Sequence, residues 1–327
     1  MRAGHAPGVK LPSARGPLTA ALTSVLAGGG RSPFPTPGSD EDLHLGLFIL
    51  YELNYRGWDG VSADAEWDPD LIRLRRDLES RFLAALHELA GPVPDPPPGS
   101  VPATLIELAA DDSGPSLSKF LRGRATLEQF REFAMHRSVY QLREADPHTF
   151  AIPRLAGQAK AALIEIQIDE YGGGQVHRMH QELFKRTMTA LELDTTYGAY
   201  VDVAPAPTLA TNNVMSLFGL HRRWRGALLG HLAAYEMTST GPNRAYGNGL
   251  RRLGGNEDAT RFYDEHVEAD AVHEQIAAYD MCGSFCAAEP ELAGDVLFGA
   301  RCALALDDAW AGYVLGCWAA GESSLRS

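Results

Sequence analysis

The hydrophobic residues of this chain recur mainly at spacings of three and four positions, which is the period of one face of an α-helix. Sustained alternation of apolar and polar residues, which marks a half-buried strand, is almost absent. Helix start signals support the same interpretation, since Ser39 precedes Asp40 as a cap and Asp68 precedes Pro69. The pattern predicts an all-α protein, with helices over residues 18–27, 40–55, 69–90, 105–110, 116–121, 126–144, 150–171, 177–191, 209–217, 221–238, 244–253, 259–281 and 291–318.

Segments rich in glycine, proline and serine divide these helices into groups. Residues 1–17 and 28–39 have this composition, and residues 91–102 hold a cluster of prolines that is typical of a linker or a rigid loop. We therefore expect a mobile N-terminal segment with one short helix over residues 1–39. A helical N-terminal extension over residues 40–100 and a main helical domain over residues 101–320 should follow.

Composition and charge exclude several classes of function for this chain. Of 327 residues, 45% are hydrophobic and 22% are charged, which is enough apolar material for a large folded core. The formal charge of −13 would repel phosphate backbones and anionic lipid surfaces, so we exclude nucleic acid and membranes as partners. The apolar run 303–320 is interrupted by Asp307 and Asp308, and residues 18–27 are too short and polar for a signal peptide. The cysteines form no CxxC pair, and we expect a cytoplasmic protein with reduced thiols.

One helix carries a potential metal-binding face. His266, Asp270 and His273 stand at positions i, i+4 and i+7, so their side chains project within a narrow wedge of one helix. Two imidazoles and a carboxylate suit iron, manganese or zinc in a catalytic site. The alternative is a solvated acidic helix face that happens to carry two histidines.

Partners for these residues come from two other predicted helices. Glu170 and His177 are seven apart and would share a face if the helix continued through the three glycines at 172–174, and His180 is the alternative imidazole. A helix that ended at those glycines would instead leave Glu170 as a solvated terminal residue. Glu236 is an acidic residue in an apolar stretch, where a buried carboxylate requires a partner or a metal.

Together these residues match the ligand count of a two-metal site that keeps open coordination positions. A ferritin-like site needs a Glu-x-x-His pair on each of two helices, and this sequence does not supply two such pairs. The His-Glu-x-x-His motif of zinc proteases is absent from it. We predict that His266, Asp270 and His273 serve one iron, while the remaining three residues serve the other and a carboxylate bridges the two. The predicted metal ligands are Glu170, His177, Glu236, His266, Asp270 and His273.

The order and spacing of these ligands resemble the haem-oxygenase-like diiron oxidases and oxygenases, often described as iron-containing redox enzymes. Residues 144–148, 215–223 and 262–278 also resemble an actinobacterial branch of that family, and the resemblance covers about residues 100–320. It implies that this part of the chain is a haem-oxygenase-like helical bundle that binds two Fe(II). It also implies an iron-dependent oxidoreductase that activates O2 to oxidise a small-molecule substrate by N-oxygenation, desaturation or oxidative C–C cleavage.

Two alternatives remain open on the sequence alone: a haem-binding or haem-degrading protein of the same fold, and a non-enzymatic helical interaction protein. No flavin or nicotinamide motif is visible, so electrons beyond those of Fe(II) must come from an external donor. A homodimer is compatible with the sequence. Arg222 and Arg225 share a helical stripe with Glu236, and we predict that one of them binds a substrate carboxylate.

Overall fold

The computed structural model describes residues 9–30, 33–93, 96–97, 99–110 and 114–327, with side chains omitted for residues 269–272. Within these residues the chain is helical, and an isolated bridge between Val9 and Trp58 is the extent of β pairing. The prediction of an all-α fold is confirmed. The α-helices are α1 (Pro17–Leu26), α2 (Asp40–Glu52), α3 (Pro69–Ala90), α4 (Val101–Ala109), α5 (Leu117–Gly123), α6 (Leu127–Gln141), α7 (Asp146–Thr149), α8 (Gly157–Glu170), α9 (His180–Ala190), α10 (Ala206–Leu220), α11 (Arg225–Arg252), α12 (Glu257–Gln275), α13 (Ser284–Ala288) and α14 (Ala293–Ala319).

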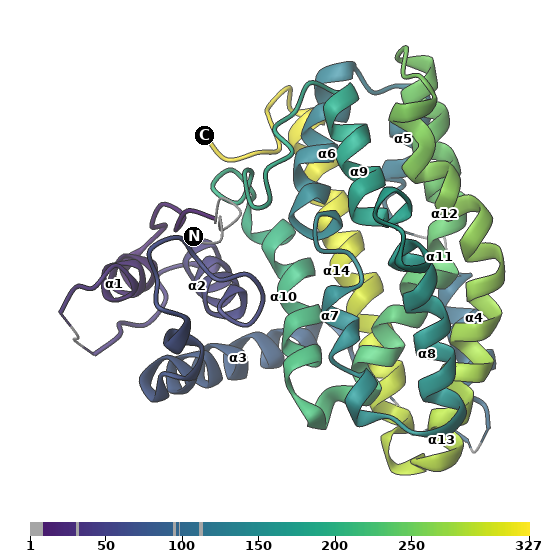
Figure 1. Ribbon diagram of the computed structural model, residues 1–327, viewed down its shortest axis with the longest axis horizontal. Coiled ribbons are helices and arrows are strands. Elements are labelled where there is room, and N and C mark those ends of the chain that lie inside the picture. The colour runs from purple at the N-terminus through teal and green to yellow at the C-terminus, as the bar shows by residue number, and fades with distance from the viewer. Residues whose placement is uncertain (1–8, 31–32, 94–95, 98, 111–113) are drawn as a thin grey trace, which may run out of the picture.

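The long helices run roughly side by side as a bundle, and α11 packs against both α12 and α14 (Figure 1). Glycines allow the backbones of α11 and α14 to approach closely. A Cβ atom at Gly230 would collide with the carbonyl of Val296, and one at Gly299 would collide with that of Ala227. Substitution at either glycine would therefore push apart two helices that enclose the centre of the bundle.

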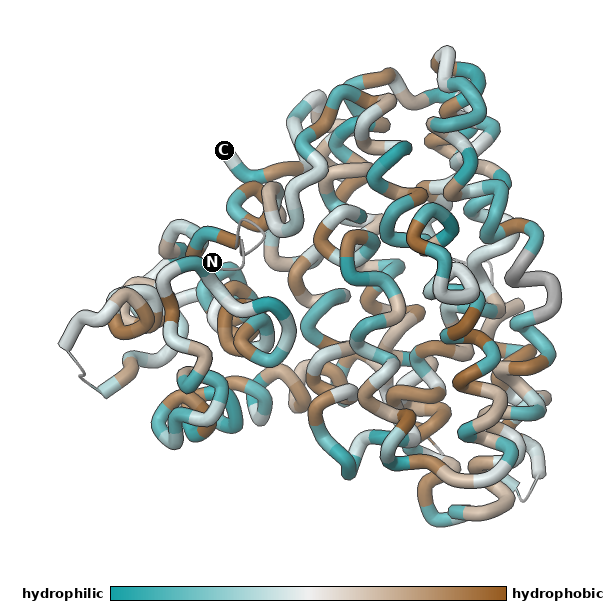
Figure 2. The backbone as a smooth tube through the Cα atoms, in the orientation of Figure 1, coloured by the Kyte–Doolittle hydropathy of each residue, from teal (hydrophilic) through white to brown (hydrophobic). Residues whose placement is uncertain are grey.

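Apolar side chains from every part of the described chain form the core. Hydrophobic and hydrophilic residues are interspersed along most helices (Figure 2), so that a helix can bury its apolar side chains and expose its polar ones. One apolar cluster extends from α1 to α14, and a second cluster, which includes Phe130, Phe184 and Phe262, fills the space between α6, α9 and α12. Burial of such aromatic side chains supplies much of the free energy that holds the helices in place.

Helices α1 to α3 lie to one side of the bundle, beside α10 (Figure 1). Helix α2 packs against α10, and α3 packs against α14. Asp42 joins α1 to α2, because its buried carboxylate accepts hydrogen bonds from the backbone N–H groups of Leu18 and Thr19 and from the Thr19 hydroxyl. The helices of the N-terminal extension (residues 40–100) therefore belong to the same packed core as the bundle.

Helix α11 differs from the prediction of two helices separated near residues 239–243. It continues through Pro242, although a proline inside a helix costs roughly 3 kcal/mol because it removes one backbone hydrogen bond and crowds the preceding turn. Side chains of α11 are buried both before and after Pro242, and their packing offsets that local cost. The sequence pattern does not reveal this packing. A further irregularity follows α12, where residues Ile276–Gly283 form a π-helical turn.

Among the helices that the structure describes, none combines the length and the apolar character that crossing a bilayer requires.

Candidate metal centre

Buried carboxylates and imidazoles gather at the centre of the bundle in two overlapping groups within the described residues. In each group, one potential ligand atom per residue lies within 4.8 Å of the others. Glu170, the last residue of α8, belongs to both groups. The first ligand set consists of Glu144, Glu170, His180 and His266, and the second ligand set consists of Glu170, Glu236 and His273.

The buried carboxylates at this centre would be stabilised by a bound cation. Burial raises the pKa values of Glu144, Glu170 and Glu236 above their usual range, because each carboxylate is cut off from water and close to other acidic groups. One carboxylate oxygen of Glu144, Oε2, is buried with no hydrogen-bond partner among the described residues. Several buried acids at this spacing are costly unless a positive charge compensates them. The residues therefore fit a metal site.

Hydrogen bonds also orient the imidazoles. His266 Nδ1 donates to the carbonyl of Phe262 at 2.8 Å, since a carbonyl can only accept, and its Nε2 lies 3.5 Å from Glu144 Oε1. This arrangement selects the tautomer in which Nε2 can bind a metal.

His273 is held by carboxylates on both sides. Its Nδ1 lies 3.2 Å from Glu236 Oε2, and its Nε2 lies 3.0 Å from Asp169 Oδ2. Burial disfavours a charged ring, but the hydrogen bond to Glu236 and the nearby acids outweigh it and raise the pKa of His273 to about 9. In the metal-free protein the His273 proton therefore supplies part of the missing positive charge, and a metal would have to displace it.

The three glycines at 172–174 decide which histidine reaches Glu170. The helix ends at Glu170, and Gly172 and Gly173 adopt φ values of 62° and 61°, which side-chain-bearing residues rarely adopt. The chain then turns back so tightly that a Cβ atom at Gly172 would lie 2.5 Å from the backbone of Arg178. His177 is consequently exposed in a 3₁₀ turn, whereas His180 is buried with Nδ1 3.2 Å from Glu170 Oε2. The structure thus places the alternative imidazole, His180, beside Glu170, and it leaves the predicted ligand His177 outside the centre.

The grouping of the side chains differs from the predicted division of ligands. His266 and His273 fall in different sets, although both lie on α12. Seven residues of α-helix extend about 10.5 Å along the axis, so the two imidazoles stand about two turns apart. Asp270 lies between them on the backbone of α12, and its side chain is outside the described part of the structure.

Two comparisons with known proteins relate this chain to proteins that have been described. The family model described as "Iron-containing redox enzyme" matches residues 131–308, more than half of the chain. The chain belongs to this iron-containing redox enzyme family. It is also 26% identical over 136 residues to nitrosourea synthase from Streptomyces achromogenes subsp. streptozoticus. That similarity covers 42% of this chain and only 29% of the relative.

Glu144 belongs to the first ligand set of this family member, but it was not among the ligands predicted from the sequence. It lies in a turn beyond the end of α6, so no helical spacing connects it to another ligand. The next residue, Ala145, has a left-handed backbone with φ of 70°, which costs roughly 1–2 kcal/mol for a residue with a Cβ atom. Gln167 Nε2 donates to the carbonyl of Ala145 at 3.1 Å and helps to hold this turn. The sequence signals were its place at the end of a predicted helix and its place at the start of residues 144–148, which resemble the family.

Both ligand sets of this family member border a cavity of about 490 Å³, which is large enough for a small organic molecule. Aromatic side chains of α6, α11, α12 and α14 form much of its wall, together with Glu144, Glu170, Glu236 and His266. Residues close to Pro242 in the chain, including Thr238 and Ser239, also line it. The arrangement places apolar surface and a few polar groups beside the candidate ligands.

The arginines predicted to bind substrate do not lie at this cavity. Arg222 is exposed, and Arg225 pairs with Glu289, so neither is among the residues that line the cavity. Arg222 lies in the 3₁₀ turn before α11, and Arg225 is the first residue of α11, about three turns before Glu236. Arg137 lines the cavity instead, with Nη2 3.1 Å from Asp307 Oδ1 and the guanidinium 4.3 Å from the centre of the Trp310 ring.

Proposed function

We propose that this protein is a non-haem diiron oxygenase or oxidase that uses O2 to oxidise a small molecule. The observation that carries the proposal is the pair of buried ligand sets that share Glu170 and border one cavity. Membership of the iron-containing redox enzyme family supports iron as the metal. A mixture of carboxylates and imidazoles is also the ligand chemistry that suits Fe(II) reacting with O2.

We propose one ion for each ligand set, with Glu170 as the shared carboxylate. Asp270 stays a proposed ligand, because on α12 it lies about one turn from both His266 and His273. Bound iron would supply the electrons and the open coordination positions that O2 reduction requires. The chain itself would hold the ions, fix the imidazole orientations through Phe262 and Asp169, and exclude water with the aromatic wall of the cavity.

The proposed reaction class is N-oxygenation, desaturation or oxidative C–C cleavage. The printed name of the similar protein favours the first of these, because a nitrosourea contains an oxidised nitrogen. Repeated turnover would require an external electron donor. A haem protein of the same fold would instead need one axial histidine in an apolar slot, whereas here buried carboxylates surround both His180 and His266.

Anaerobic metal binding followed by reaction with O2 tests this function. The protein loaded with Fe(II) should hold two irons per chain, show no Soret band and consume O2 faster in the presence of a suitable small molecule. A screen of amines, amino acids and fatty acids with an oxygen electrode would find that molecule. Failure to bind iron, or copurification of stoichiometric haem, would contradict the proposal.

We further propose that Arg137 selects substrates that carry a carboxylate. Arg137, on α6, borders the same cavity as Glu144, Glu170 and His266 of the first ligand set. Arg137 pairs with Asp307 and also interacts with Tyr246, and a guanidinium has five N–H donors, so it could in addition form paired hydrogen bonds with a substrate carboxylate. A substrate bound in this way would be oriented with respect to both ligand sets.

Arg137→Ala should abolish discrimination between a carboxylate substrate and its neutral carboxamide. In the wild type we expect the carboxylate to give a kcat/KM at least about tenfold higher, since a hydrogen bond between charged groups contributes roughly 1.5–3 kcal/mol. Arg131→Ala is the matched control, because Arg131 lies on the same helix but pairs with Glu192 away from the cavity. Unchanged discrimination in Arg137→Ala, with iron content intact, would exclude this role.

A further inference from the structure

The N-terminal extension contacts the chain segments that carry two of the candidate ligands. Glu52, at the end of α2, is buried and accepts hydrogen bonds from Arg143 Nη1 at 3.4 Å and from the Tyr197 hydroxyl at 2.8 Å. Arg143 immediately precedes Glu144 and is 1% exposed, with its guanidinium 4.6 Å from the centre of the Tyr55 ring. A buried ion pair therefore joins the extension to the residue next to a candidate ligand.

Arg56 connects the same extension to both ligand-bearing segments. Its Nη2 donates to the carbonyl of Leu142 at 3.3 Å and to Gln181 Oε1 at 3.4 Å, and its guanidinium stacks 4.0 Å from the centre of the Tyr197 ring. Gln181 follows His180 directly, and its Nε2 donates to the carbonyl of Glu144 at 3.0 Å. One arginine side chain thus links the turn that carries Glu144 to the first turn of α9.

These links matter because regular helix geometry does not hold either ligand. Glu144 lies in a turn between α6 and α7, next to the left-handed Ala145. His180 is the first residue of α9 and follows two 3₁₀ turns. Backbone hydrogen bonds inside a long helix fix Glu236 and His266, whereas Glu144 and His180 depend on contacts made by their neighbours in the chain. Such supporting contacts commonly set the affinity of a metal site.

We infer that Arg56 and Glu52 are positioning residues for the first ligand set, and that the N-terminal extension thereby controls metal binding at the centre of the bundle. This inference rests on the proposed diiron function. The extension lies outside residues 131–308, so its contribution adds to what the family model covers. Loss of the link through Arg56 should weaken the first ligand set and leave the second set, on α8, α11 and α12, intact.

Anaerobic Fe(II) titration of Arg56→Ala, followed by Mössbauer spectroscopy, tests the inference. We expect wild-type protein to bind two irons, and the variant to bind one iron with unchanged affinity and the other about 10- to 100-fold more weakly. Tyr197→Phe removes the hydroxyl that holds Glu52 but keeps the ring under Arg56, and it should show a smaller shift in the same direction. This second variant keeps the test decisive if Arg56→Ala folds poorly.

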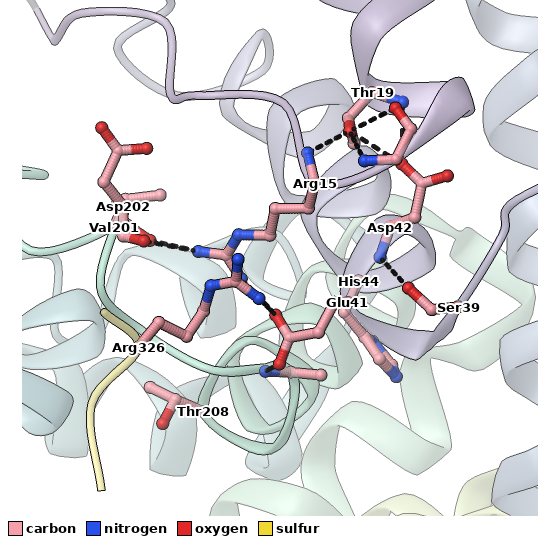
Figure 3. Close-up of polar contacts among 12 residues, drawn as sticks. Arg15, Thr19, Ser39, Glu41, Asp42, His44, Val201, Asp202, Thr208 and Arg326 are labelled. Atoms are coloured by element: carbon pink, nitrogen blue, oxygen red, sulfur yellow. Dashed lines mark hydrogen bonds and ion pairs between the residues drawn. The ribbon is translucent and has the colours of Figure 1, made fainter. Parts of the chain in front are cut away.

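Arg15→Ala is the matched control. Arg15 pairs with Glu41 of α2 at 2.8 Å and donates to the carbonyl of Val201 at 2.6 Å, so it also joins the N-terminal region to a later segment of the chain (Figure 3). Neither partner belongs to a ligand set or adjoins a ligand in the chain. The Arg15→Ala variant should bind both Fe(II) ions with the affinities of the wild type, even if its melting temperature falls. Equal binding of two irons by Arg56→Ala and wild type would overturn the inference, as would equal loss in Arg15→Ala. Failure of the wild type to bind iron would instead overturn the proposed function.

Discussion

Glu170→Gln should lower turnover by more than about a hundredfold and prevent the binding of a full complement of iron. Glu170 is the residue that belongs to both ligand sets, so its loss weakens two metal positions at once. Loss of a supporting partner alone typically costs a metal site 10- to 100-fold, and a shared ligand should cost more. Iron analysis after anaerobic loading, together with O2 consumption, measures both effects.

The same variant should not destabilise the metal-free protein. Burial raises the pKa of Glu170, which means that its ionised form opposes folding, and an amide of similar volume removes that charge. The melting temperature of the metal-free variant should therefore equal or exceed that of the wild type. Glu165→Gln is the control, because Glu165 is exposed on the same helix and should leave both iron content and turnover unchanged. Full activity in Glu170→Gln would refute the shared site.

His180→Ala should reduce iron binding towards one per chain and lower turnover by a similar factor of about a hundred or more. His180 is buried beside Glu170, and its ring lies 4.3 Å from that of His266, so it can contribute to the first ligand set. The second ligand set does not contain His180 and should keep its iron. Mössbauer spectra and metal analysis would distinguish loss of one iron from loss of both.

His177→Ala provides the direct comparison. His177 is exposed, so its removal should leave iron content, turnover and melting temperature close to those of the wild type. If His177→Ala lost iron and His180→Ala kept it, His177 rather than His180 would be the ligand. Circular dichroism of both variants would show whether a loss of iron reflects loss of the fold.

Several features of this protein follow from local sequence. The helical period of its apolar residues indicates an all-α fold, because each amphipathic helix must bury one face regardless of its neighbours. Glu236 stands out in the sequence as an acid within an apolar stretch, and His266 and His273 stand out by their shared helical face. The structure brings all three to the centre of the bundle. Spacing along one regular helix is a local property, so sequence alone can expose it.

Other features were decided only by tertiary structure. The position of His180, rather than His177, beside Glu170 depends on how the chain turns back at Gly172, and the helical period carries no information across such a break. Glu144 enters the first ligand set from a turn, and Arg137 reaches the cavity while Arg222 and Arg225 do not, because long-range helix packing sets these positions. Residues in turns and across helices are placed by contacts between distant segments, and these contacts exist only once the chain has folded.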